Sequence, residues 1–146
     1  MKISTRVQYG TQLMIYLGLY YGKGSVFLKD IAKMENISEK YLSQIIIALK
    51  SAGLVHSFRG AHGGYSLAIK PSEITLKEIV EVLEGDLSFV NGKPISSESP
   101  RASAYVTRNL WDAVGDRITE MLDSVTLETL VRQCREKQEN AVQYNI

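Results

Sequence analysis

Residues 28–51 read LKDIAKMENISEKYLSQIIIALKS, and this stretch decides the fold. Its first third has the apolar spacing of a short amphipathic helix. Asn36 tolerates the left-handed backbone conformation that ends a helix, and Ser38 is a favourable N-cap for the next one. Ile37 and Leu42 flank that cap at the positions of a hydrophobic staple, which fixes the angle between two helices. The stretch therefore predicts a helix-turn-helix pair.

The second predicted helix, residues 39–51, has one face turned to the core and one turned outward. Its apolar residues recur at intervals of three and four and must face inward; they are Leu42, Ile45, Ile46 and Leu49. The outward face carries Lys40, Ser43, Gln44 and Ile47, with Tyr41 beside them and Lys50 near the end. Such a face suits insertion into the major groove of DNA. An ordinary solvated helix face is equally compatible with the pattern.

After this pair, residues 58–67 read FRGAHGGYSL, a glycine-rich segment between two alternating runs. A phosphate-binding loop needs a helix after its glycines, whereas the alternation over residues 54–58 and 65–69 predicts strands. A β-hairpin directly after a helix-turn-helix defines a winged helix. The glycines permit positive φ and close approach to another surface, and Arg59 at the tip suits a narrow minor groove. A surface turn with an incidental arginine is the alternative.

Composition bounds the class of protein. A chain of 146 residues with 45% hydrophobic content is about one domain and can bury a real core. The single cysteine, Cys134, excludes an intramolecular disulfide and a thiolate cluster within one chain, which fits a reducing compartment. Gln8 and Gln12 interrupt the early apolar run, which argues against a secretory signal, and no run approaches the roughly 18 residues of a membrane span. We expect a cytoplasmic protein without membrane contact.

The net charge of +1 conceals a division of charge along the chain. Residues 1–70 carry nine Lys and Arg against three Asp and Glu, whereas residues 71–146 carry eight against thirteen. A basic first half suggests contact with a polyanion. Chance partition of surface charge is the alternative.

The second half of the chain begins with a helix start signal and contains a long helix. Thr75 and Glu78 form a capping box, so a helix runs from there to Gly85. Residues 85–103 are rich in Ser, Gly and Pro and lack periodicity, which predicts a flexible or functional loop. From Ala104 onward, apolar residues recur every three or four positions in a wide stripe. The matching helix of a second copy is the expected cover for this stripe; packing on the chain's own first helix is the alternative, and both can hold at once.

In order and spacing these features resemble the IscR/NsrR/CymR family of bacterial winged-helix transcription regulators. The similarity covers residues 1–133 and rests on the MKIST start and five further motifs, which are Ile37-Ser38-x-x-Tyr41-Leu42-x-Gln44, Gly53-Leu54-Val55, Arg59-Gly60-x-x-Gly63-Gly64-Tyr65, Leu110-Trp111 and Val125-Thr126-Leu127. The resemblance implies a mainly α fold with a small β-hairpin, in which a winged helix-turn-helix domain precedes a long C-terminal dimerisation helix. It also implies a homodimer on a pseudo-palindromic operator of double-stranded DNA. We expect a repressor and not an enzyme, because no set of nucleophile, base and oxyanion donors is visible.

The resemblance assigns roles to residues of this sequence. The second helix reads the major groove and the wing arginine reads the minor groove. Ser43 stands where the family often has an acidic residue, and Arg6-Val7-Gln8 replaces a common Lys-Gly-Arg, which leaves Arg6 as a phosphate contact. The predicted DNA contacts are Arg6, Ser38, Lys40, Tyr41, Ser43, Gln44, Lys50, Arg59, His62, Gly63 and Gly64. The predicted dimer interface is Val106, Leu110, Trp111, Val114, Ile118, Met121 and Leu122.

The resemblance also bears on cofactors. Its iron–sulfur members carry three cysteines in the loop at 85–103 and a histidine shortly after it. Here the loop has no cysteine, and Arg108 stands at the position of the histidine. Thiolates hold such clusters, so we predict no cluster of the usual kind, no metal ion and no other cofactor. The spacing of His56 and His62 does not form a zinc-binding pattern.

The signal that controls such a regulator stays open. A regulatory partner protein, oxidation of Cys134 and a small ligand at the loop are all compatible with the sequence, as is constitutive DNA binding. An unconventional iron–sulfur or heme centre shared across the dimer is a further alternative. The rival function is a protein-interaction module that uses the winged fold without DNA. We divide the chain into a DNA-binding domain at 1–84, a flexible loop at 85–103, and a dimerisation helix with a C-terminal helix at 104–146.

Overall fold

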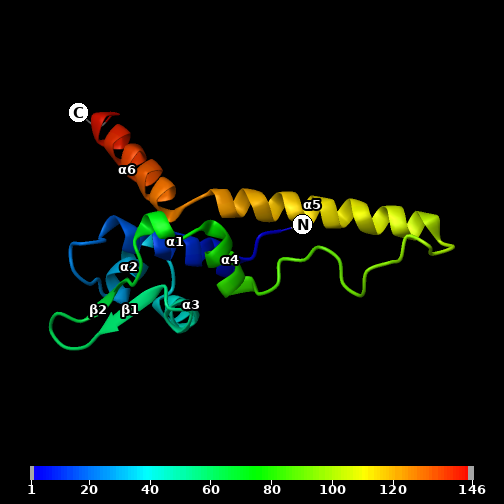
Figure 1. Ribbon diagram of the computed structural model, residues 1–146. Coiled ribbons are helices and arrows are strands. Elements are labelled where there is room, and N and C mark those ends of the chain that lie inside the picture. The colour runs from blue at the N-terminus through cyan, green and yellow to red at the C-terminus, as the bar shows by residue number, and fades with distance from the viewer. Residues whose placement is uncertain (1, 145–146) are drawn as a thin grey trace.

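The structure of the chain is a computed structural model that describes residues 2–144 (Figure 1). Its helices are α1 (Thr5–Leu19), α2 (Leu28–Glu35), α3 (Glu39–Ser51), α4 (Leu76–Glu84), α5 (Ala102–Ser124) and α6 (Leu127–Tyr144). Two strands, β1 (Val55–Phe58) and β2 (Gly64–Leu67), form an antiparallel hairpin, and a 3-10 turn (Pro71–Glu73) precedes α4. This arrangement confirms the predicted mainly α fold with a small β-hairpin.

The helix-turn-helix pair, α2 and α3, begins and ends where the local sequence predicts. Asn36 adopts the left-handed conformation, with φ 55° and ψ 47°. The Ser38 hydroxyl accepts a hydrogen bond from the backbone N–H of Tyr41 at 3.3 Å, which caps α3. Ile37 and Leu42 are both buried in the core, as the staple requires. These interactions lie within a few residues of one another, so sequence alone is enough to specify them.

The wing contains one element more than the sequence predicts. β1 pairs with β2 in a register that runs from Val55 opposite Leu67 to the end of the hairpin. Val26, before α2, pairs with Tyr65 through two backbone hydrogen bonds of 2.8 Å. The segment before α2 therefore joins the hairpin through a single β-bridge, and it ties the hairpin to the helix-turn-helix.

α1 runs through the centre of a single hydrophobic cluster and contacts α3, α4 and α6. Two glycines permit this close packing. A Cβ at Gly10 would clash with the side chain of Leu83 in α4, and one at Gly18 would clash with Val131 in α6. The core of the fold is thus assembled around one helix whose small residues admit its neighbours.

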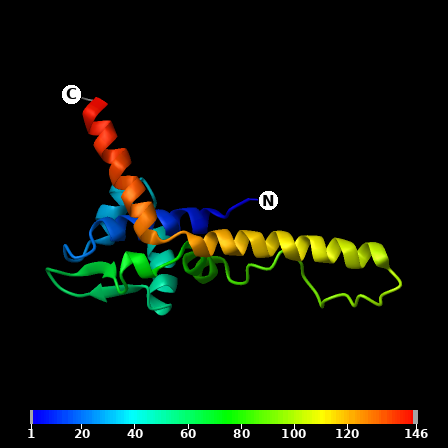
Figure 2. The same cartoon turned by 45° about the horizontal axis from the view of Figure 1, so that its top comes forward.

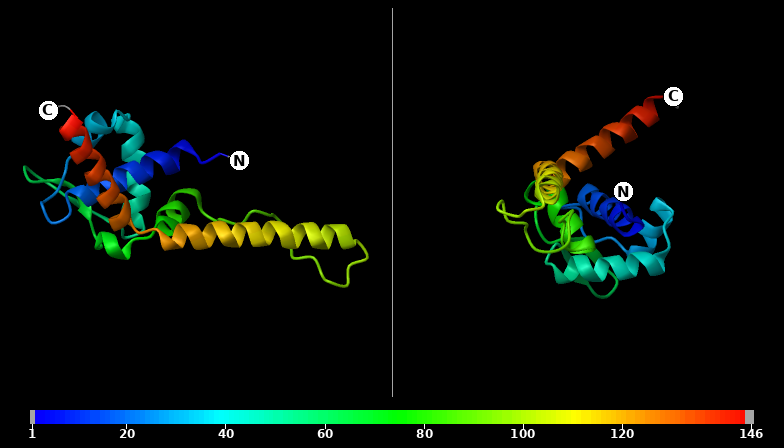
Figure 3. Two further views of the ribbon diagram at one scale, coloured as in Figure 1. Left: turned by 90° about the horizontal axis from the view of Figure 1, so that it is seen from above. Right: turned by 90° about the vertical axis from the view of Figure 1, so that its right-hand side faces the viewer.

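The two C-terminal helices occupy different places (Figure 2). α6 packs on α1, and its Leu127 and Val131 are buried in the common core. α5 packs on α4 and projects away from the core, with Gly115 its buried residue. The main partner of α1 is thus α6, whereas α5 reaches the common core mainly through Leu122. The predicted dimerisation helix and C-terminal helix of residues 104–146 correspond to α5 and α6, which run in different directions (Figure 3).

α5 is anchored firmly at its C-terminal end. The N–H of Leu76 donates to the carbonyl of Val125 at 2.8 Å, and the N–H of Leu127 donates to the carbonyl of Ile74 at 2.8 Å. These bonds join the end of α5 to the start of α4.

None of the helices within residues 2–144 combines the length and the apolar composition that a membrane span requires.

Candidate nucleic-acid interface

α3 and the wing lie side by side on the side of the molecule away from α6 (Figure 1). The four apolar residues predicted to face inward along α3 are all buried. On the outward face Lys40, Gln44 and Lys50 are exposed, whereas Tyr41 and Ser43 are half-buried. The structure therefore brings Ser38, Lys40, Tyr41 and Gln44 together at one groove, whereas Ser43 and Lys50 lie outside its lining.

The hydroxyls at the start of α3 already hold local hydrogen bonds. Ser38 caps the helix, and the Ser43 hydroxyl donates to the carbonyl of Lys40 at 2.6 Å. The ring of Tyr41 packs edge-on against Tyr9 of α1, with 5.7 Å between centroids. The exposed chemistry of this end of α3 comes mainly from the ammonium of Lys40 and the amide of Gln44. Both line a surface groove of about 520 Å³ between α1 and α3.

The wing tip is an exposed turn that the protein holds from behind. Arg59 and His62 are exposed, and Gly60 adopts a positive φ of 92°. The hydroxyl of Ser25 lies 2.8 Å from the carbonyl of His62 and 2.7 Å from that of Gly63, so its single proton is donated to either one or shared between them. The wing arginine is thus presented on a braced turn.

The folded structure itself requires two glycines of the wing. A Cβ on Gly64, whose φ is +116°, would overlap the carbonyl oxygen of Val26, and one on Gly63 would lie 2.8 Å from the carbonyl oxygens of Phe58 and Gly60. Gly63 is also buried. The close approach expected at these glycines is therefore to the chain's own backbone, and a direct DNA contact from them stays a prediction.

Arg6 is engaged inside the protein. Its Nε–H donates to the carbonyl of Leu83 at 3.1 Å, in the last turn of α4, where a cation complements the helix dipole. Next to it, the hydroxyl of Ser4 donates to the carboxylate of Glu84. These contacts give Arg6 a role in joining α1 to α4 that the sequence did not suggest. A phosphate contact from its remaining N–H groups stays a prediction.

The predicted dimer residues divide into two groups along α5. Four are exposed, namely Val106, Leu110, Trp111 and Met121, and three are half-buried, namely Val114, Ile118 and Leu122. Ile118 and Leu122 line a cavity of about 540 Å³ with residues of α1 and α4, and Leu122 packs against the core. The chain itself thus covers part of the stripe and leaves open its N-terminal part and, further along the helix, Met121.

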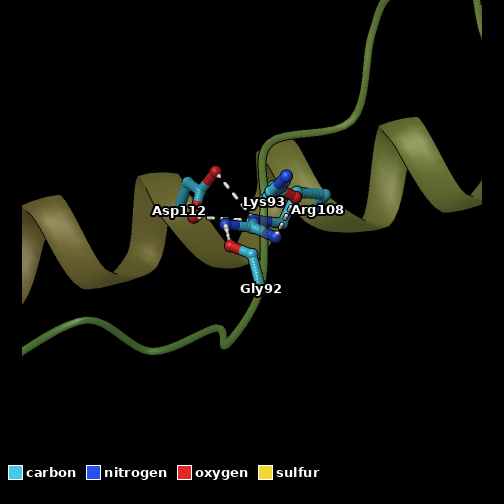
Figure 4. A network of polar contacts seen from close by, with 4 residues as sticks. All are labelled: Gly92, Lys93, Arg108 and Asp112. Atoms are coloured by element: carbon cyan, nitrogen blue, oxygen red, sulfur yellow. Dashed lines mark hydrogen bonds and ion pairs between the residues drawn. The ribbon is translucent and has the colours of Figure 1, made fainter.

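The segment between α4 and α5, which the sequence predicts to be a flexible or functional loop, contacts α5 at Arg108 and at Gly115. Arg108 donates from Nη1 to the carbonyl of Lys93 at 3.0 Å and from Nη2 to the carbonyl of Gly92 at 3.1 Å (Figure 4). Its Nε lies 3.3 Å from the carboxylate of Asp112 one turn on. Only 13% of the arginine side chain is exposed. Arg108 therefore joins loop and helix at a largely covered point.

Candidate metal ligands do not gather in the described part of the chain. Among residues 2–144, no three His, Cys, Asp or Glu side chains lie close enough to hold a metal ion. His56 is exposed on β1, and His62 is exposed at the wing tip. Cys134 is half-buried on α6. That the protein binds no metal stays a prediction.

Two residues of this surface are absent from the predicted contacts. Ile47, on the same face of α3 as Gln44, is 63% exposed, and the sequence places it there by its spacing alone. Ser25 braces the wing from a segment that shows no strand pattern. No local signal identifies Ser25, because its partners lie 37 and 38 residues away along the chain.

Known proteins are similar to this chain in both sequence and fold. The sequence profile of the Rrf2 family, described as iron-dependent transcriptional regulator, matches residues 3–133. The HTH-type transcriptional regulator CymR of Bacillus subtilis is 44% identical over 139 residues, which is 95% of this chain and 96% of that protein. The solved structure of CymR, described as the global cysteine regulator of B. subtilis, gives a TM-score of 0.78 at 44% identity, covering 91% of this chain and 98% of that one. The structure of T. potens IscR gives 0.76 at 41% identity, covering 94% and 91%.

Proposed function

The chain belongs to the Rrf2 family of transcriptional regulators, and on this premise we propose that it is a homodimeric repressor of a pseudo-palindromic operator. DNA-binding transcription regulation is what the similar proteins share. The observation that carries the proposal is the exposed polar face of α3 beside the braced arginine of the wing. We propose action in the cytoplasm and no enzymatic activity.

The recognition surface combines three kinds of contact. Lys40 and Gln44, exposed near the start of α3, suit hydrogen bonds to base edges in the major groove. Ile47 suits apolar contact with a thymine methyl group on the same face. Lys50 at the end of α3 suits a backbone phosphate. Together these residues supply both sequence readout and electrostatic attraction.

The exposed apolar residues of α5 support the proposed homodimer. Leu110 and Trp111 are 56% and 47% exposed, although both are large apolar side chains at the middle of a long helix. Contiguous apolar surface of this kind marks interaction sites. A symmetric dimer presents two basic winged domains to one duplex, with half-sites about one helical turn, or a multiple, apart.

The family description names iron, but the residues of this chain do not fit an iron centre. The loop between α4 and α5 contains no thiol, and Arg108 occupies the point where that loop meets α5. A guanidinium carries only donors and stays protonated, so it cannot ligate a cation. In the described chain no cluster of ligand side chains compensates for this. We therefore propose regulation that does not use an iron centre of this chain.

The signal and the target genes remain proposals. Cys134 is half-buried on α6, which gives an oxidant partial access to its thiol. A partner protein or a small ligand acting near the loop is the alternative signal. Because CymR is described as the cysteine regulator of B. subtilis, genes for cysteine supply are the first targets to test.

A gel-shift assay against DNA selected from a random pool tests the function. A protein that neutralises six to ten phosphates loses about 10³–10⁵ in affinity between 50 and 200 mM salt. We expect a steep decrease of that kind for the selected site, and weaker binding to a scrambled duplex of the same composition. Weak binding that does not respond to salt would instead support an interaction module without DNA.

The variant Arg59→Ala tests the role of the wing. Because Arg59 is exposed at the tip and the turn behind it is braced by Ser25, we expect a loss of about 1–3 kcal/mol in operator binding without a change in folding. Arg132→Ala, which removes an exposed arginine from α6, is the matched control. If both variants bind the operator as tightly as the wild type, the wing does not belong to the interface.

A further inference from the structure

The N-terminal half of α5 is supported differently from its C-terminal half. Backbone hydrogen bonds at Val125 and Leu127 anchor the C-terminal end, and α4 packs beside the helix. Of the described chain, the segment that follows α4 is what runs along the N-terminal half (Figures 1 and 2). The exposed apolar residues Val106, Leu110 and Trp111 lie on this half.

Two contacts dock the segment on α5. The first is the fork of Arg108, whose two terminal nitrogens donate to the successive carbonyls of Gly92 and Lys93 (Figure 4). The second is the ring of Phe89, which lies so close to Gly115 that a Cβ there would be 3.2 Å from the ring. A Ser88 hydroxyl that donates to Asp86 orders the start of the segment and lowers the pKa of that carboxyl. The segment is therefore a strut that joins the end of α4 to the middle of α5.

Arginine is well suited to this position, because its planar guanidinium offers several N–H donors in a fixed geometry. Two of these donors satisfy two adjacent backbone carbonyls at once, and the third faces Asp112 on the same helix. A lysine has no fork and cannot reproduce this arrangement. The ion pair with Asp112, which also lines a pocket beside residues 85–89, orients the guanidinium through its Nε.

A small change in the angle of α5 has a large effect at its far end. With a rise of about 1.5 Å per residue, Val106 lies roughly 28 Å along the helix from the anchor at Val125. A swing of about 10° would move that end by roughly 5 Å, which exceeds the rise of about 3.4 Å per base along a DNA strand. If α5 could rotate about its anchor, the distance between two DNA-binding domains joined through α5 would therefore not be fixed.

We propose that Arg108 is a positioning residue, which fixes the angle of α5 against the winged domain by docking residues 86–93 and thereby sets the half-site spacing that the dimer accepts. This inference rests on the proposed function, since it concerns the geometry of the operator-bound dimer. It gives the loop a mechanical role that needs no cofactor. Arg108 itself contacts no DNA in this proposal.

Limited proteolysis tests the docking without reference to DNA. The variant Arg108→Ala should be cleaved by chymotrypsin after Leu87 or Phe89 at least about tenfold faster than the wild type. The reason is that the carbonyls of the strut lose the charged N–H donors that hold it on α5. Asp112→Asn keeps both carbonyl contacts, and Arg117→Ala removes an exposed charge from the same helix. Both controls should be cleaved at nearly the wild-type rate. An unchanged cleavage rate in Arg108→Ala overturns the proposal.

Operators of different spacing test the positioning role. The wild type should bind its selected site at least about tenfold more tightly than the same site with one base pair added or removed between the half-sites. In Arg108→Ala this preference should fall to threefold or less, while the protein stays dimeric and its melting temperature stays near that of the wild type. A preference that survives although the loop has become protease-sensitive overturns the positioning role. If the wild type binds no DNA specifically, the proposed function fails, and the cleavage rates still decide the docking.

Discussion

Leu110→Asp should convert the protein to a monomer and lower its operator affinity by at least about a hundredfold. Leu110 lies in the exposed apolar part of α5, between Val106 and Val114 on the same face of the helix. In a symmetric interface the substitution places a carboxylate on both partners. Each buried, unpaired charge costs several kcal/mol, so the association is lost. A monomer can occupy one half-site only, and the contacts of the second half-site no longer contribute.

Sedimentation or light scattering gives the oligomeric state, and a gel shift gives the affinity. Asn109→Asp is the matched control, because it places the same charge on an exposed neighbour that belongs to no predicted contact. The helix content of both variants should equal that of the wild type, since Leu110 contributes little to the chain's own core. A Leu110→Asp protein that remains dimeric would show that the partner copy docks on another surface.

Gly64→Ala should lower the free energy of unfolding by about 3–5 kcal/mol, the largest effect expected from a single methyl group in this chain. Two causes add at this position. The residue has a φ of +116°, and a Cβ would overlap the carbonyl oxygen of Val26 and lie 2.7 Å from its carbonyl carbon. Backbone cannot yield as a flexible side chain does. The clash falls on the pairing of Val26 with Tyr65, which ties the wing to the helix-turn-helix.

Gly60→Ala separates the two causes. Gly60 also has a positive φ, of +92°, but a Cβ there would meet nothing within 4 Å. This variant should therefore show only the conformational cost of about 1–2 kcal/mol. Urea denaturation measures both, and the melting temperature of Gly64→Ala should fall by roughly 6–20 °C. Equal losses in the two variants would mean that the contact with Val26 does not constrain the wing.

The sequence determines those parts of the protein whose causes are local. The bounds of α2 and α3 follow from Asn36, Ser38 and a three- and four-residue spacing, and each of these interactions closes within one helical turn. The capping box at Thr75 is local in the same way, since its hydroxyl accepts from the N–H of Glu78 three residues on. The outward face of α3 is fixed as soon as its inward face is known. The winged helix, and the surface proposed to bind DNA, could therefore be predicted from the residues alone.

The tertiary structure decides what depends on partners far along the chain. Arg6 reads as a phosphate contact in sequence, yet its guanidinium reaches Leu83, 77 residues away. The sequence predicts that DNA approaches the backbone closely at Gly64, yet in the structure it is Val26 that leaves no room for a Cβ there. Both α5 and α6 carry apolar stripes, and only the packed core shows that α6 takes the place on α1. In the sequence, Arg108 is notable only because it stands where related proteins have a cluster ligand. The fold brings two loop carbonyls to its nitrogens. The spacing of apolar residues along a helix shows which of its faces is buried. Which other element packs on that face depends on how all the apolar faces of the chain are buried together in the folded structure.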